Sequence, residues 1–194
     1  MKTGIINTLI ICVMAVLPAG FLTAQEISYT STDDSYVLVK GTSTLHDWEL
    51  RSETLMSEVN FTAENNDEIE SLESVMFIVE KTTLESDRSR LEEMAHEEMD
   101  AGTHPEITFR SDDGIVRSNG YEYNVTATGD LTISGVTRSV SVDATCISTG
   151  DEMVCTGTKD LQMTDFGIDP PRLMLGTLRT DDDITVEFRV VYTR

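Results

Sequence analysis

The feature that most constrains the fold is a strict alternation of apolar and polar side chains over long stretches. From Tyr121 to Ile133 every second residue is apolar or small, and the residues between them are mostly polar. Because successive side chains of a β-strand point to opposite faces, this period of two predicts a long strand with one buried face. Ser134-Gly135 predicts a turn, and residues 136–146 and 184–190 repeat the alternation.

Further strands are predicted over residues 36–42, 49–63, 72–82 and 107–111. Long antiparallel strands joined by tight turns predict a mainly β fold, an up-and-down β-barrel of about eight strands. An immunoglobulin-type sandwich is the alternative, but a strand as long as 121–133 is unusual for it. A doubly wound α/β fold is poorly supported, because one segment alone has a helical period.

That segment lies near the middle of the chain. Its apolar stripe recurs at helical spacing among glutamates, at Leu91, Met94, Ala95 and Met99. The pattern predicts an amphipathic helix over residues 88–100 that closes one side or end of the barrel. Ser89 and Glu92 have the spacing of a capping box, and Gly102 is suited to end the helix.

The first 24 residues have the pattern of an export signal. Lys2 precedes a mostly apolar run from Ile5 to Leu17, and Thr23-Ala24 offers a cleavage site with a small last residue. The apolar run is too short for a membrane span, so residues 1–24 predict a signal peptide rather than a stable membrane anchor. Residues 25–194 then form one exported domain, in the periplasm or secreted.

The charge of the chain excludes one class of partner. The formal net charge is −21 at pH 7, from 35 acidic and 14 basic residues. Such a surface repels phosphate backbones and anionic membrane faces, which argues against nucleic-acid binding. The acidic surplus fits a well-solvated surface, and an acidic docking face for a basic partner is the alternative.

Two cysteines remain once the leader is removed. An even pair in an exported protein predicts a disulfide between Cys146 and Cys155. Gly150-Asp151 suits a two-residue hairpin turn, and pairing outward from it places the cysteines opposite each other at a non-hydrogen-bonded site, within disulfide range. The competing metal site needs two further ligands, and no other Cys or His lies nearby in the sequence.

Catalytic and metal-binding motifs are missing from the sequence. The three histidines, His46, His96 and His104, form no i, i+4 pair, and no HExxH motif is present. The sequence also lacks a Gly-x-Ser-x-Gly elbow, a Walker loop and a dinucleotide fingerprint. It therefore predicts no catalytic residue, no metal site and no cofactor, and a protein that is not an enzyme.

Four segments carry a resemblance to a known family. In chain order they are Gly41–Trp48 (GTSTLHDW), His104–Phe109 (HPEITF), Gly129–Arg138 (GDLTISGVTR) and Asp165–Ile168 (DFGI). Together they resemble the YceI-like family over roughly residues 30–194. The resemblance implies a lipocalin-like barrel of a periplasmic protein, with a long cavity for a polyisoprenoid chain.

The predicted inward faces give the candidate ligand site. Its apolar lining comprises Phe77, Val79, Leu131, Ile133, Val140, Val142, Leu161, Met163, Ile184, Val186 and Phe188. Polar residues that could recognise a headgroup at the barrel mouth are His46, Asp47, Thr137, Arg138 and Arg172. For these polar residues a purely structural role, such as a turn hydrogen bond or an ion pair, stays open.

The function that follows is to bind or carry a hydrophobic small molecule, an isoprenoid, quinone-like or other lipid. The alternative is a barrel that its own side chains fill. Such a protein would be a structural or stress-related interaction module with an acidic docking surface. The sequence does not indicate an oligomeric state.

Overall fold

The computed structural model describes residues 25–64, 68–149, 151–173 and 177–194, and the predicted signal peptide lies outside these residues. Most of the described chain is antiparallel strand: β1 (Gln25–Ser31), β2 (Tyr36–Ser43), β3 (Trp48–Ser52), β4 (Leu55–Glu64), β5 (Glu68–Glu80), β6 (Glu106–Ser111), β7 (Gly114–Ser118), β8 (Glu122–Ile133), β9 (Val136–Ser148), β10 (Glu152–Gln162), β11 (Arg172–Leu173) and β12 (Leu178–Thr193). The helical segments are α1 (Ser89–Glu98) and the 3₁₀ turns η1 (Lys81–Thr83) and η2 (Met163–Phe166).

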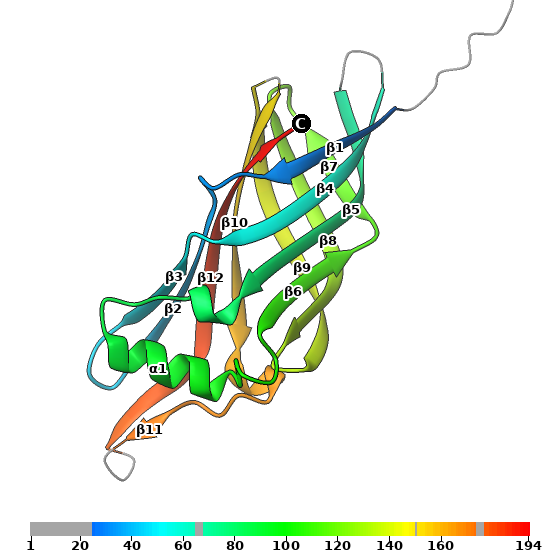
Figure 1. The fold of residues 1–194 in the computed structure, drawn as a ribbon. Coiled ribbons are helices and arrows are strands. Elements are labelled where there is room, and N and C mark those ends of the chain that lie inside the picture. Colours follow the sequence, from blue (N-terminus) through cyan, green and yellow to red (C-terminus); the bar gives the residue numbers. More distant parts are fainter. Residues whose placement is uncertain (1–24, 65–67, 150, 174–176) are drawn as a thin grey trace, which may run out of the picture.

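Eight of these strands form a closed ring (Figure 1). Neighbours pair in the order β1, β4, β5, β6, β8, β9, β10 and β12, and β12 returns to β1 through the pairs Thr30–Thr193 and Ser31–Tyr192. All of these pairings are antiparallel. The predicted mainly β, barrel-like fold with one α-helix is confirmed for the described residues.

The ring is extended along β12, its longest strand. Residues 180–189 of β12 pair with β2, and β2 carries β3 as its hairpin partner. At this end α1 lies across the lower end of the strands in Figure 1. The apolar side of the helix faces inward, and Leu91, Ala95 and Met99 pack against the buried cluster of Val37, Leu50, Val79 and Leu84. The prediction that the helix closes one end of the fold is confirmed.

The predicted strand over residues 49–63 is wrong in one respect, because the chain turns after Ser52 and forms two strands. The Thr54 N–H donates to Ser52 Oγ, and that hydroxyl lies 2.6 Å from Thr83 Oγ1. Local bonds of this kind from a serine side chain compete with a strand ladder. The strands β1, β7, β10 and β11 lie outside the predicted strand ranges, although the predicted hairpin pairing through Cys155 reaches the first residues of β10. Of these, β7 and β11 are too short to show a long alternation.

The helix lies within the predicted residues 88–100, but its predicted caps are wrong. Arg88 is the N-cap residue, and no side chain caps this end. Glu92 does not close a capping box with Ser89, because its Oε2 accepts a hydrogen bond from the Ser86 N–H at 3.2 Å.

The end of the helix does not use Gly102. Asp100 takes the left-handed conformation instead, with φ of 50°, and the Ala101 N–H donates to the His96 carbonyl at 3.0 Å. Aspartate tolerates this conformation better than most residues, because its short polar side chain can hydrogen-bond locally.

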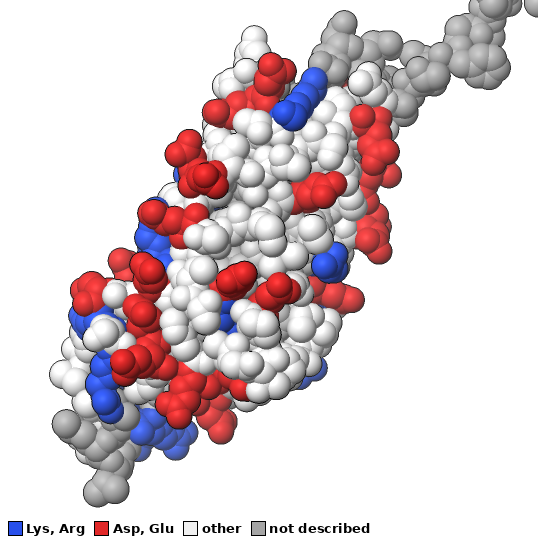
Figure 2. Space-filling model, in the orientation of Figure 1, with Lys and Arg blue, Asp and Glu red and all other residues white. Residues whose placement is uncertain are grey.

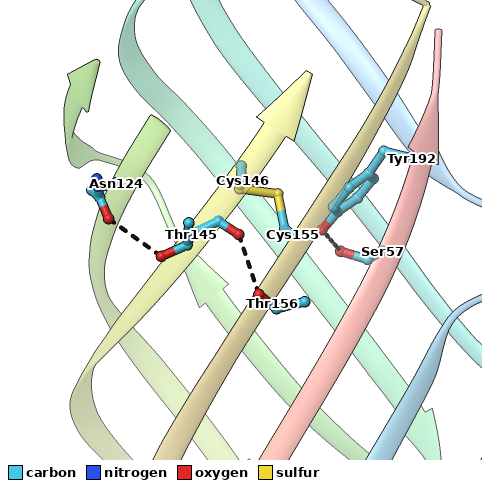
Figure 3. The surroundings of a disulfide bond; sticks show 7 residues. All are labelled: Ser57, Asn124, Thr145, Cys146, Cys155, Thr156 and Tyr192. Atoms are coloured by element: carbon cyan, nitrogen blue, oxygen red, sulfur yellow. Dashed lines mark hydrogen bonds between the residues drawn. A yellow bond between two sulfur atoms is a disulfide. The ribbon is translucent and has the colours of Figure 1, made fainter. Parts of the chain in front are cut away.

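The predicted disulfide is present between β9 and β10 (Figure 3). Residues 146–148 pair with residues 153–155, so Cys146 and Cys155 lie directly opposite each other with their Cα atoms 4.0 Å apart. The predicted hairpin register is confirmed, although Gly150 of the predicted turn lies outside the described residues. Both cysteines are buried on the inner face of the ring.

A buried tyrosine near the disulfide joins β12 to β4 (Figure 3). The hydroxyls of Tyr192 and Ser57 lie 2.7 Å apart, and Ser57 Oγ donates to the Met76 carbonyl. Tyr192 therefore donates its proton to Ser57. Burial raises the pKa of Tyr192 to about 12, so the phenol stays neutral over the ordinary pH range.

We predict that the disulfide stabilises the ring and takes part in no redox cycle. Replacing both Cys146 and Cys155 by serine should lower the free energy of unfolding by roughly 2–3 kcal/mol, because the short loop of the unfolded chain is no longer constrained. Urea titration of the oxidised protein and of the double variant measures this difference. Two freely alkylated thiols in native protein from an oxidising compartment would contradict the bond.

Candidate functional site

The inner faces of the strands enclose an apolar cavity of about 250 Å³. Its wall comes from the strands of the ring, from the β2–β3 hairpin and from α1. Several of its side chains, among them Leu131, Val186 and Phe188, face inward yet are only half-buried. Inward-facing side chains keep accessible surface only where the interior is not filled, so the ring is partly hollow.

Ten of the eleven predicted lining residues lie around this cavity: Phe77, Val79, Leu131, Ile133, Val142, Leu161, Met163, Ile184, Val186 and Phe188. Val140, the eleventh, is not among the residues around the cavity. Its side chain is partly buried and packs against the buried core cluster of the ring. The alternation of β9 predicts correctly that Val140 faces inward, but it cannot tell a packed inner position from an open one.

The cavity extends from the disulfide to α1. Phe61 and both cysteines line its far end, and Phe61 meets the buried Tyr29 edge to face with ring centroids 6.3 Å apart. At the other end α1 contributes apolar side chains to the wall, namely Leu91, Met94, Ala95 and Met99. The helix is therefore the covering element, held mainly by contacts of one apolar stripe.

A buried lysine fixes the C-terminal end of this helix. Lys81 is fully buried, and its Nζ donates to the Met99 carbonyl at 2.6 Å and to Ser134 Oγ at 3.2 Å. Ser134 Oγ also donates to the Met99 carbonyl, at 2.8 Å. A cation at the carbonyl end of a helix interacts favourably with the helix dipole. Burial lowers the pKa of Lys81, and the nearby carboxylate of Asp100 opposes this shift.

Three of the four family-like segments meet at the covered end. Gly135 has φ of +78°, and a Cβ there would lie 2.7 Å from the His104 imidazole. Arg138 Nε donates to the Asp165 carbonyl at 2.8 Å. Phe166 packs in one cluster with Ile133. These segments are thus joined by direct contacts that fix the turns around the cavity.

The fourth segment, Gly41–Trp48, contributes the tryptophan that lines the cavity. A Cβ on Gly41 would lie 2.2 Å from the ring of Trp48, so the glycine allows the indole to lie against β2. The indole N–H donates to the Thr42 carbonyl at 3.2 Å.

The five predicted mouth residues do not line the apolar cavity. His46 is exposed in the β2–β3 loop, and its carbonyl accepts a hydrogen bond from Ser43 Oγ. Thr137 bonds to Thr132 on the outer face, Arg138 makes the bond to Asp165 described above, and Arg172 pairs in β11 with Arg179. These residues belong to sequence motifs or loops, and the structure places them at turns and strand ends.

Asp47, the fifth of them, lines a separate and more open groove of about 940 Å³ beside the cavity. Trp48, Leu91 and Ile184 line both spaces, so the groove adjoins the cavity. It lies where β12 bulges between Thr180 and Ile184. The other groove residues are mostly charged or polar: Lys40, Gly41, Thr42, Glu49, Asp87, Arg88, Asp160, Asp181, Asp183 and Thr185.

Two charged residues, Glu98 and Lys159, also line the apolar cavity. Neither was among the predicted site residues. Lys159 follows Cys155 and Gly157 at every second position of β10 and precedes Leu161, so the alternation of that strand could have placed it on the inner face. Glu98 is the last residue of α1, and the helical period of three to four residues does not determine whether its side chain points toward the cavity or toward solvent.

Among the residues that the structure describes, no cluster of three or more His, Cys, Asp or Glu could hold a metal ion. The helix in the described part of the chain is too short and too polar to cross a membrane.

The sequence matches the YceI-like domain over residues 26–192. It is also similar to the UPF0312 protein VPA0850 of Vibrio parahaemolyticus, with 29% identity over 102 residues, which are 48% of this chain and 52% of that protein. The chain thus spans about half the length of this curated relative.

Two solved structures share the fold. Burkholderia cenocepacia BcnA superimposes with a TM-score of 0.67 at 19% identity, covering 83% of this chain and 98% of that one. A polyisoprenoid binding domain from Saccharophagus degradans, implicated in plant cell wall breakdown, has a TM-score of 0.63 at 9% identity, covering 86% and 97% of the two chains. At these identities the likeness shows the fold.

We predict that Lys81 makes the free energy of unfolding depend on pH in the alkaline range. Because its pKa is lowered on folding, the native state releases the proton at a lower pH than the unfolded chain, whose value is near 10.5. The contribution of Lys81 to the free energy of unfolding should therefore increase as the pH rises toward 10.5. Denaturant titrations at several alkaline pH values should show this slope in the wild type and lose it in Lys81→Met. Parallel pH profiles of the two proteins would contradict the prediction.

Proposed function

Because the chain belongs to the YceI-like family, we propose that it binds a long apolar molecule, an isoprenoid, quinone-like or other lipid, inside the ring. The observation that carries this proposal is the cavity, whose wall is apolar apart from a few residues and whose inward side chains are only half-buried. An apolar chain gains about 0.8 kcal/mol for each methylene that it buries, so this wall alone can provide the affinity. The polyisoprenoid binding domain of Saccharophagus degradans, which has the same fold, supports the same ligand class.

The size of the cavity gives α1 a role in binding. About 250 Å³ is below the roughly 300–1,000 Å³ usual for sites that enclose a small ligand. A long chain therefore needs more room than the closed structure provides. The helix is the element that can supply it, since none of its residues is fully buried. In the proposed function α1 moves outward to admit the chain and packs against it afterwards.

In the proposed function the protein binds and carries its ligand and does not catalyse a reaction. The disulfide and the predicted signal peptide support a place in an oxidising compartment outside the cytoplasm, the periplasm or the medium. Release to another carrier or to a membrane then needs only the opening of α1.

The second candidate function, an interaction module with an acidic docking surface, has one observation in its favour. Figure 2 shows Asp and Glu spread over the visible face, with fewer Lys and Arg among them. The partly hollow interior argues for the ligand-binding proposal, because a module that only docks gains nothing from a cavity. Extraction of the native protein with organic solvent, followed by mass spectrometry, separates the two: a co-purified isoprenoid or quinone supports binding.

We predict that Val186→Trp blocks binding without unfolding the protein. Val186 faces the cavity from β12, so the indole occupies the space of the ligand. Binding of an apolar fluorescent probe should be lost, while circular dichroism and the melting temperature stay close to the wild type.

The matched control is Thr158→Trp, which adds the same bulk at an exposed position of β10. It should bind the probe like the wild type. If Val186→Trp instead destabilises the fold by about 1–3 kcal/mol, as bulk does in a packed core, and leaves binding unchanged, the filled-ring alternative is correct.

A further inference from the structure

The inner wall of the cavity carries one lysine. On β10 the residues around Lys159 alternate strictly: Thr158 and Asp160 are exposed, while Lys159 is half-buried and lines the cavity together with Leu161. Lys159 pairs with Val186 across the β10–β12 ladder, and Val186 pairs in turn with Val39 of β2. Lys159 therefore lies in a row of inward-facing residues across three strands, and the other two residues of the row, Val186 and Val39, are aliphatic.

The side chain of Lys159 makes no hydrogen bond or ion pair with any residue that the structure describes. This is unexpected in a chain with 35 acidic and 14 basic residues, where a carboxylate partner is easily found. By contrast, the outward-facing Lys40 on β2 bonds Glu187 at 2.8 Å, and Lys81 is bonded to backbone and serine oxygens. A lysine whose side chain lines an apolar space and whose ammonium has no partner points to a group that the ligand supplies.

The ladder between β9 and β10 ends beside Lys159. The pairing of β9 with β10 runs from Ser148–Met153 to Ala144–Gly157 and ends there, two residues before the lysine. The rest of β9 continues to pair with β8. Figure 1 shows the two strands diverging toward the lower end. Below the end of this ladder η2 lies against both strands, because Arg138 of β9 donates to the Asp165 carbonyl and Leu161 of β10 packs in one cluster with Met163 and Phe166.

From this geometry we infer that the ammonium of Lys159 anchors the oxyanion of an amphiphilic ligand, a carboxylate or a phosphate, while the apolar tail fills the cavity. The inference rests on the proposed function, since the tail must lie in the same cavity. It assigns a headgroup site that differs from the mouth residues predicted from the sequence. The chemical class that follows is a fatty acid or an isoprenoid acid or phosphate, rather than an uncharged quinone or alcohol.

The acidic surface does not oppose such a ligand once it is bound. Charges on the outside are screened beyond about 8–10 Å at ordinary ionic strength, whereas the ammonium acts on a bound headgroup at contact distance. The other charged residue of the lining, Glu98, belongs to α1 and is exposed to solvent. Glu98 and Lys159 form no ion pair, so the lysine is available to the ligand.

The test compares two probes that differ only in the headgroup, dodecanoic acid and dodecan-1-ol, by calorimetric titration of the full mature protein at neutral pH. Charge-assisted hydrogen bonds imply that the wild type prefers the ionised acid by roughly tenfold to a hundredfold. Lys159→Met should remove this preference by weakening the acid and leaving the alcohol unchanged. Lys159→Arg should keep it, and it provides a charged variant if the methionine variant folds poorly.

The control is Arg110→Met, which removes one exposed positive charge from β6 outside the cavity and should bind both probes like the wild type. Equal affinities of the wild type for acid and alcohol, or an equal loss of both in Lys159→Met, would overturn the anchor and leave the proposed function standing. If the wild type binds neither probe, the proposed function fails and the anchor fails with it.

Discussion

The structure depends on the closure of the sheet at β12. A sheet with free edges leaves a row of backbone donors and acceptors unpaired, and closing it into a ring removes them. Here the last link is short, because β1 meets β12 through only the pairs Thr30–Thr193 and Ser31–Tyr192. The buried hydrogen bond from Tyr192 to Ser57 reinforces it by joining β12 to β4 directly. The disulfide lies one strand away, between β9 and β10, so covalent and hydrogen-bonded links reinforce the same end of the ring.

The strong contacts gather at one end of the cavity. Phe61 and both cysteines line that end, and the buried side chains of Tyr29 and Met153 add packed core beside it. Toward α1 the strands diverge, β2 replaces β1 beside β12, and the helix covers the space. Hollow interiors forgo packing energy, since the lining residues lose contacts on one side. A ring that is well packed at one end can tolerate that loss at the other.

Two lysines on the inside of the fold differ in whether their charged group has a hydrogen-bond partner. Lys81 is fully buried, and its bonds to the Met99 carbonyl and to Ser134 Oγ make it part of the structure. Lys159 faces the cavity and has no partner among the described residues. Buried charge is costly unless it is hydrogen-bonded. The first lysine therefore belongs to the helix attachment, and the second is best understood through what the cavity holds.

Much of the fold could be predicted because it depends on local patterns. The alternation from Tyr121 to Ile133 predicts β8 almost to the residue, and the amphipathic stripe predicts α1. Counting outward from Gly150-Asp151 predicts the register that brings Cys146 against Cys155. The same alternation predicts inward positions, and ten of the eleven residues predicted for the apolar lining lie around the cavity. These predictions succeed because the periods of strand and helix are properties of the backbone itself.

What the sequence alone determined is therefore which faces turn inward, the hairpin register of the cysteines and the resemblance to the YceI-like family. The tertiary structure decided the rest. Whether an inward residue lines the cavity, like Val142, or does not, like Val140, depends on how side chains from distant segments fill the interior. The partner of a charge depends on contacts between distant segments, as between Lys81 and Met99. Local periodicity carries no information about such distances, because strands and helices of identical pattern can be assembled around a filled core or a hollow one.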